Sequence, residues 1–148
     1  MPPKISIEEA VRESLDNDRR LRRPAEVAVM VDDGVVTLRG TVGTFGQRLA
    51  AVRDARKVHG VDYVGDQIEV RILDVDRRSD AELRGMALQA IAWDTDAPDE
   101  EIEVKVTDGW VTLTGEVTYQ FQSDAAYGDV AKLFGVIGIT NEIRVVNL

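Results

Sequence analysis

The chain has no cysteine, one histidine and no long apolar segment. Without cysteine, disulfide bonds, cysteine-ligated zinc and thiol catalysis are excluded. Its apolar runs fall far short of the ~20 residues that a transmembrane helix needs. The residues after Met1 lack the apolar core of a secretory signal, so the sequence as given predicts a cytoplasmic protein, or a periplasmic one if a leader was removed.

Groups that could perform catalysis are also scarce. His59 lies at the end of a predicted helix, where a positive charge favours the helix dipole without any catalytic role. The serines are scattered, and no nucleophile stands beside a base. We therefore predict a protein that is not an enzyme, with no catalytic residue, no metal site and no cofactor.

Charge is unevenly distributed along the chain. The 27 acidic and 18 basic residues give a net charge of −9, which disfavours a protein whose whole surface binds nucleic acid. Divided at residue 75, the first part holds about 12 basic and 13 acidic residues, and the second about 6 and 14. An anionic partner should prefer the first part, and a cationic partner the second.

One stretch occurs twice, at residues 33–42 and 108–117. Each copy begins with Asp-Gly, preceded and followed by alternating apolar residues, which is typical of a β-hairpin with a tight turn. When residues 27–73 are aligned with 102–148 without a gap, about 19 of 47 positions are identical. The chain is therefore two copies of one unit.

Each copy is expected to contain two helices and three strands. Ser6 and Asp80 are the expected N-caps of the first helices, and Trp93 should pack in the core at the end of its helix. The expected elements are helices at 6–21, 47–59, 80–93 and 121–134, hairpins around residues 34 and 109, and strands at 66–73 and 142–146.

The order of elements predicts an α+β fold of two α-β-β-α-β repeats, residues 1–75 and 76–148. In each repeat a hairpin followed by a crossover helix gives a three-stranded mixed sheet, and two helices can cover only one of its faces. The matching glycines are expected to be structural: Gly34, Gly40, Gly60, Gly109, Gly115 and Gly135. The open faces should carry Met30, Val35, Thr37, Arg39, Glu69 and Arg71 in one repeat, and Lys105, Trp110, Thr112, Thr114, Arg144 and Val146 in the other.

The doubled signature, Asp-Gly-x-Val-Thr-Leu-x-Gly-x-Val followed by Gly-Val and a final Ile-x-Val strand, resembles the BON domain, the bacterial osmotic-shock and nodulation domain. This family occurs in tandem in periplasmic osmotically induced proteins and outer-membrane lipoproteins. The resemblance implies a role in osmotic stress and binding to phospholipid or other membrane-associated partners. The signature residues themselves are structural.

A basic cluster is the main candidate for binding anionic phospholipid. Arg19, Arg20, Arg22 and Arg23 follow the first helix, where cations also favour the helix dipole. Each basic residue near an anionic membrane contributes about 1 kcal/mol. The second helix can extend the cluster through Arg53, Arg56 and Lys57, unless these residues form only its solvated side.

The aromatic residues concentrate in the second repeat. The alternation of its hairpin turns Trp110 outward, where an interface or membrane anchoring would use it, although packing against the other repeat would explain it as well.

Three alternatives to lipid binding stay open. A protein-interaction or self-assembly module, including a homo-oligomer, would pair the near-neutral first repeat with the acidic second one. Cation binding at the acidic turns is another. Nucleic-acid binding is disfavoured, because the Gly43-x-x-Gly46 loop, which resembles a KH-domain loop, is absent from the second copy.

Overall fold

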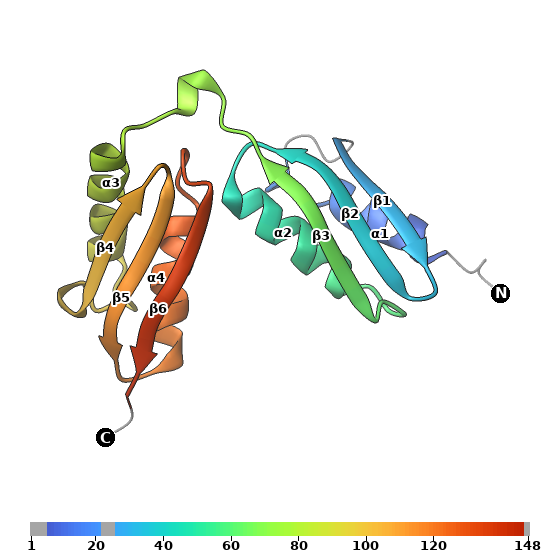
Figure 1. Cartoon of the computed structure of the whole chain (residues 1–148). Coiled ribbons are helices and arrows are strands. Elements are labelled where there is room, and N and C mark those ends of the chain that lie inside the picture. The colour runs from blue at the N-terminus through green and yellow to red at the C-terminus, as the bar shows by residue number, and fades with distance from the viewer. Residues whose placement is uncertain (1–5, 22–25, 147–148) are drawn as a thin grey trace. The chain divides into compact units, whose positions relative to one another are not determined.

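The computed structural model describes residues 6–21 and 26–146. The chain divides into two compact units, Met1–Arg71 and Ile72–Leu148 (Figure 1). Each unit has the order α-β-β-α-β, so the predicted α+β fold with two repeats is confirmed.

The first unit is built from α1 (Ile7–Asp16), β1 (Val27–Asp32), β2 (Val35–Val42), α2 (Phe45–Arg56) and β3 (Tyr63–Val70). Its sheet has the order β1-β2-β3. Strands β1 and β2 are antiparallel, whereas β2 and β3 are parallel. The crossover through α2 therefore produces the mixed sheet that the sequence predicts.

The second unit repeats this topology with the sheet order β4-β5-β6. Its parallel and antiparallel pairs match those of the first sheet position by position. A short 3-10 helix, η2, begins the unit, and another, η3, precedes its hairpin. Its elements are η2 (Asp74–Asp76), α3 (Asp80–Trp93), η3 (Asp99–Glu101), β4 (Ile102–Thr107), β5 (Trp110–Val117), α4 (Gln120–Ala131) and β6 (Gly138–Val145).

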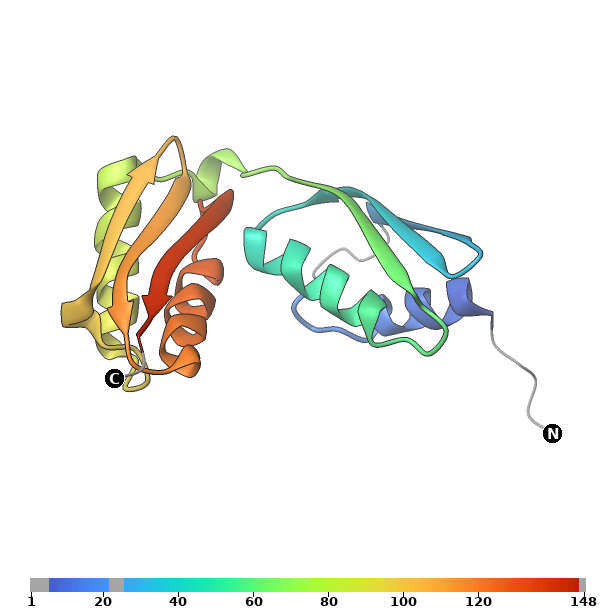
Figure 2. The same ribbon diagram turned by 60° about the horizontal axis from the view of Figure 1, so that its bottom comes forward.

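The two helices of each unit cover one face of its sheet (Figure 2). Alternate strand residues such as Val36 and Leu38, or Val111 and Leu113, are fully buried beneath the helices. The intervening residues lie on the other face, where Met30, Val35 and Trp110 are among the exposed apolar side chains. The predicted open face is therefore present in both units.

Backbone geometry explains the repeated Asp-Gly and the later glycine. Asp33 and Asp108 both have a φ of 50°, and the glycines that follow have values of 81° and 82°, as a primed hairpin turn requires. A Cβ on Gly40 would overlap the carbonyl oxygen of Glu26. All six glycines predicted to be structural have positive φ values.

The first helix is shorter than the sequence predicts. Ser6 is its N-cap as expected, accepting from the Glu9 N–H at 3.1 Å. The helix ends at Asp16, not at Leu21. Asp18 forms a turn instead: its carbonyl accepts from Leu21 N–H at 3.1 Å, and its carboxylate from Arg20 N–H at 2.9 Å.

Other predicted boundaries also shift. Helix α2 begins two residues earlier than expected because Thr44 caps it, accepting from Gln47 N–H at 3.1 Å. It ends at Arg56, so Gly60 lies in the following turn. Strands β3 and β6 begin earlier than predicted, at Tyr63 and Gly138.

Two predictions for the third helix were wrong. Its N-cap is Ser79, whose hydroxyl accepts from Glu82 N–H at 3.1 Å. Asp80 instead contacts the hairpin turn, where its carboxylate accepts from the backbone N–H groups of Asp108 and Gly109. Trp93 is 77% exposed. The buried positions Leu83, Ala87 and Ile91 define the inner side of α3, and a residue two positions after Ile91 points away from it.

Candidate functional site

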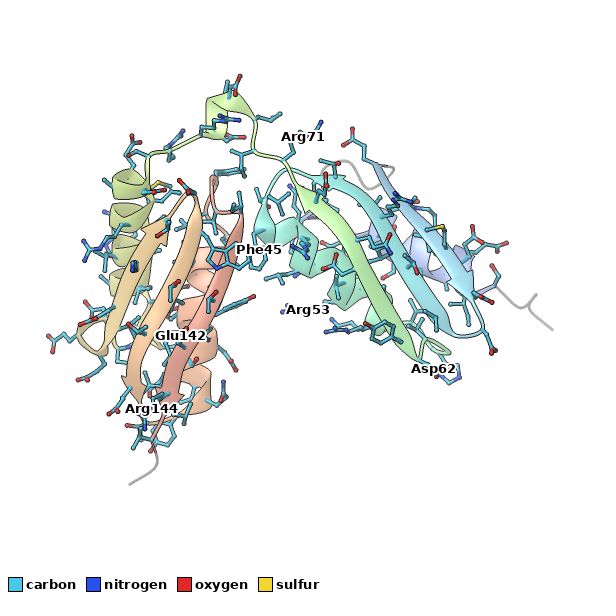
Figure 3. The ribbon with its side chains drawn as sticks, viewed as in Figure 1. Phe45, Arg53, Asp62, Arg71, Glu142 and Arg144 are labelled. Atoms are coloured by element: carbon cyan, nitrogen blue, oxygen red, sulfur yellow. The ribbon has the colours of Figure 1, made fainter. Side chains whose placement is uncertain are left out.

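Exposed cations of the first unit lie on α2 and on the turn after α1, and the contact of Arg20 with Asp54 joins these two elements. Arg53 and Arg56 lie in the last turn of α2, and Lys57 is its C-cap. All three are exposed, and Figure 3 shows Arg53 projecting outward from α2. Arg19, also exposed, comes from the turn after α1, a helix that packs against α2.

Arg20 holds that turn against α2. Its guanidinium binds the Asp18 carboxylate through two nitrogens, at 3.0 and 2.7 Å, and reaches Asp54 of α2 at 3.5 Å. Buried Leu21 closes the same turn. Arg20 is therefore occupied by acidic partners, and its main effect is to position the turn that carries Arg19.

The predicted cluster is thus assembled in part. Arg19, Arg53, Arg56 and Lys57 form no ion pair within the part of the chain that the structure describes. We name these four residues and Arg20 the basic cluster. Two members of the predicted set, Arg22 and Arg23, lie outside the described residues.

The second unit has almost none of this positive charge. Its α4 carries Gly128 and Ala131 where α2 carries Arg53 and Arg56, while the lysine after the helix is retained as Lys132. The turn after α3 carries Thr95 and Asp96, where the equivalent turn after α1 carries Arg19 and Arg20. The fold therefore does not require the basic cluster, because the second unit forms without it.

A carboxyl pair that the sequence analysis missed underlies the basic cluster. Asp54 is 7% exposed, and burial, followed by the neighbouring Asp18, raises its pKa to about 7. The hydrogen bonds from Arg20 hold the pKa of Asp18 well below its usual range. One Asp54 oxygen, Oδ2, is buried without a partner among the described residues.

The second unit contains the equivalent pair, Asp94 and Asp129. Burial, followed by the hydrogen bond and charge of Asp94, raises the pKa of Asp129 to about 7. The hydrogen bond to Asp129 in turn lowers the pKa of Asp94. Identical aspartates at 54 and 129, each among apolar residues of a helix, were the available signal in the sequence.

The remaining surface beside α1 is acidic. A shallow hollow between α1 and β1 is lined by four carboxylates, with Arg12 at its side: Glu8, Glu9, Glu13 and Asp16. This hollow lies on the side of α1 that faces β1, while the basic cluster lies toward α2. The helical layer of the first unit is therefore divided into an acidic and a basic part.

Trp110 lies on the open face of the second sheet, as predicted. It is 43% exposed, and its ring covers Gly138 on the neighbouring strand, where a Cβ would overlap it. Its indole N–H donates to the Thr140 hydroxyl at 2.7 Å. The ring is thus held flat against the sheet.

The first sheet carries an aromatic ring over the matching strand, but from a different residue. Tyr63 stands at the position equivalent to Gly138, opposite Val35 in place of Trp110. Its ring lies beside Gly65, and the residue is 64% exposed. Each open face therefore presents one aromatic residue, a feature that the sequence analysis recognised only in the second repeat.

The structure offers little support for the other candidate sites. Among the described residues, no group of three or more acidic or histidine side chains could hold a metal ion. None of the helices formed by these residues combines the length and the apolarity that a membrane span requires. In the Gly43–Gly46 segment, Thr44 caps α2, so local helix capping accounts for this loop.

Comparison with known proteins decides the family. The model of the BON domain matches residues 6–72 and again residues 79–147. The chain belongs to the BON domain family. Its similarity to the Osmotically-inducible protein Y of Escherichia coli (strain K12) is 31% identity over 130 residues, covering 82% of this chain. The match spans 63% of that relative's length.

Two solved structures similar to this chain come from Chlamydia trachomatis. CdsD, described as a structural protein of the Type III secretion system, has a TM-score of 0.41 at 12% identity, and the match covers 96% of this chain and 63% of that one. A structure of the CdsD C-terminal domain has a TM-score of 0.39 at 10% identity, covering 95% and 65%.

Proposed function

We propose that this tandem BON protein is a non-enzymatic binding protein that associates with anionic phospholipid surfaces through the basic cluster. The observation that carries the proposal is that exposed cations lie on two adjoining elements of the first repeat, α2 and the turn after α1, whereas the second repeat keeps only Lys132 at the matching positions. Arginine suits this role because its planar guanidinium can donate two hydrogen bonds to one phosphate.

The expected affinity is modest. With about 1 kcal/mol for each basic residue near the surface, Arg19, Arg53, Arg56 and Lys57 together supply roughly 4 kcal/mol. Because this attraction is electrostatic and the side chains are exposed, salt should weaken it strongly. The association is therefore reversible and sensitive to ionic strength.

The acidic surfaces determine which side meets the membrane. The hollow beside α1 and the acidic second repeat would be repelled by anionic headgroups. Contact through the α2 side of the first repeat keeps the basic cluster closest to the lipid. The resemblance to an osmotically inducible relative supports a role for this association during osmotic stress.

Sedimentation with vesicles tests the proposal. The full chain is mixed with phosphatidylglycerol vesicles, or with neutral phosphatidylcholine vesicles, at salt concentrations of about 50 and about 300 mM. We expect binding only to the anionic vesicles, and mainly at the lower salt concentration. Equal binding to both lipids, or binding unaffected by salt, would contradict the proposal.

A second candidate function is the binding of a protein partner through the open sheet faces. It is favoured by the exposed aromatic ring that each face presents, Tyr63 in one repeat and Trp110 in the other. Aromatic residues are enriched in protein interfaces. Light scattering across ionic strength tests the homo-oligomer version, because a strictly monomeric protein at every salt concentration would exclude it.

A further inference from the structure

Each repeat contains a carboxyl pair, but only the pair of the first repeat lies beneath a basic cluster. The Asp54 and Asp18 side chains of the first repeat are about 10% and 9% exposed. Arg53 precedes Asp54, and Arg56 and Lys57 follow it within one turn of α2. In the second repeat, Asp129 has only Lys132 in place of these three cations.

Two adjacent carboxyl groups avoid repulsion by retaining one proton between them. When Asp54 is ionised, its Oδ2 has no donor among the described residues. When Asp54 is protonated, its hydroxyl can donate to Asp18, which Arg20 keeps ionised. Burial and the charge of Asp18 place this protonation near neutral pH.

The charged groups facing Asp54 are few. They are Asp18 and Arg20 from the turn after α1, and Lys57 from α2 itself. The negative charge of Asp18 offsets the positive charge of Arg20. The protonation state of Asp54 therefore decides whether a second negative charge lies beneath the basic cluster. The corresponding groups around Asp129 are Asp94, Asp96 and Lys132, which together are not basic.

We propose that the proton shared by Asp18 and Asp54 regulates the basic cluster, so that binding of anionic headgroups strengthens as the pH falls from about 8 to about 6. This inference rests on the proposed function. Removal of one negative charge beside the headgroups should strengthen binding about threefold to fivefold. The pair in the second repeat titrates without this effect, because no basic cluster surrounds it.

Vesicle binding at two pH values tests the regulation. The full chain is titrated with phosphatidylglycerol vesicles at about pH 6 and about pH 8, at constant ionic strength. Wild type should bind more tightly at the lower pH. Asp54→Asn has an amide that can donate to Asp18 but carries no charge, so this variant should bind equally tightly at both pH values. Asp129→Asn should show the same pH dependence as wild type.

A further variant tests whether the pH dependence of binding comes from the histidine and not from the carboxyl pair. His59, the one histidine of the chain, is exposed and follows α2, so its substitution is the matched control. If the pair is responsible, His59→Gln retains the pH dependence. Loss of the dependence in His59→Gln, or its persistence in Asp54→Asn, would overturn the inference.

Reciprocal linkage gives a measurement on the unmodified protein. If protonation strengthens headgroup binding, then headgroup binding must raise the pKa of Asp54. Carbon-detected NMR of the Asp54 carboxyl, with and without phosphatidylglycerol bicelles, should show this rise, and an unchanged titration would overturn the inference. Vesicle binding that ignores pH refutes the regulation alone, whereas no binding at either pH refutes the proposed function and the regulation with it.

Discussion

Asp54 of α2 and Asp129 of α4 occupy the same position in the two repeats, and each has its Oδ2 buried without a hydrogen-bond partner among the described residues. Each also lies against a second aspartate, Asp18 or Asp94, from the turn after the preceding helix. The duplication has therefore preserved a strained electrostatic pair, although the surrounding cations differ. The free energy of unfolding should therefore depend on pH over the range in which these pairs titrate.

Asp129→Asn should stabilise the protein at high pH. Because burial and Asp94 raise the pKa of Asp129 from 3.8 to about 7, the folded state retains a proton that the unfolded state has lost between these values. Stability therefore falls as the pH rises through this window and stays reduced above about 7. Asparagine removes that loss while keeping a donor for Asp94.

Urea unfolding of wild type and Asp129→Asn at about pH 4 and about pH 8 checks this prediction. We expect similar free energies of unfolding at the lower pH and a gain of about 1–2 kcal/mol for the variant at the higher one. A variant that is equally or less stable than wild type at the higher pH would show that the ionised Asp129 carboxylate does not destabilise the folded state.

The aromatic residues of the two open faces should be exchangeable only as pairs. Gly138→Tyr alone should be destabilising, because its side chain would overlap the Trp110 ring. Trp110→Val combined with Gly138→Tyr recreates the Val35 and Tyr63 pair of the first repeat. The double variant should therefore recover stability.

A double-mutant cycle followed by far-UV circular dichroism measures this coupling. We expect a favourable coupling energy of at least about 1 kcal/mol between the two substitutions. Additive effects would indicate that the Trp110 ring does not occupy the space above Gly138.

Gly115→Ala should destabilise the second repeat by about 2 kcal/mol or more. The residue has a φ of 135°, and an added Cβ would overlap the Glu101 carbonyl oxygen. Gly128→Ala is the matched control, because Gly128 lies within α4 and an added Cβ there meets no atom within 4 Å. Alanine at that site should stabilise by about 0.5–1 kcal/mol.

Thermal unfolding of both variants tests this pair. The expected outcome is a lower midpoint for Gly115→Ala and an unchanged or higher one for Gly128→Ala. Equal tolerance of the two substitutions would contradict the close approach of the backbones at Gly115.

Asp80 should stabilise the second hairpin. Its carboxylate accepts from the backbone N–H groups of Asp108 at 2.9 Å and Gly109 at 3.1 Å. Asp80→Ala should cost about 1–2 kcal/mol and speed hydrogen exchange at those two amides. Glu100→Ala, which removes the same charge from an exposed residue of η3, should leave both amides protected as in wild type.

The repeat and its topology could be predicted because they depend on local patterns. Alternating apolar residues around Asp-Gly determine the hairpins, and a helix between two strands forces the parallel crossover. The capping pattern at Ser6 is equally local and was confirmed. These features need no knowledge of distant contacts.

The wrong boundaries depend on contacts between residues far apart or on competing hydrogen bonds. Asp18 ends the first helix early by bonding its own turn, which helical periodicity does not reveal. Asp80 looked like an N-cap, but the hairpin turn 28 residues later occupies its carboxylate. Trp93 looked like a core residue because of its apolarity, although its helical position faces outward.

The candidate site was predictable in composition but not in assembly. The sequence identified the cations after α1 and on α2, and the structure shows that Arg20 is occupied by Asp18 and Asp54. The carboxyl pairs required tertiary structure, because their members lie 36 and 35 positions apart. The ligand-binding roles of these residues and of Trp110 remain proposals for experiment.

The most direct test of the account compares two variants of equal charge in binding to phosphatidylglycerol vesicles. Arg53→Gly with Arg56→Ala introduces the second repeat's residues into the basic cluster, whereas Arg39→Thr with Arg71→Val does the same at exposed positions on or beside the open sheet. We predict that the first pair weakens binding about tenfold or more and the second about threefold or less. Equal losses in the two variants would contradict a specific role for the basic cluster.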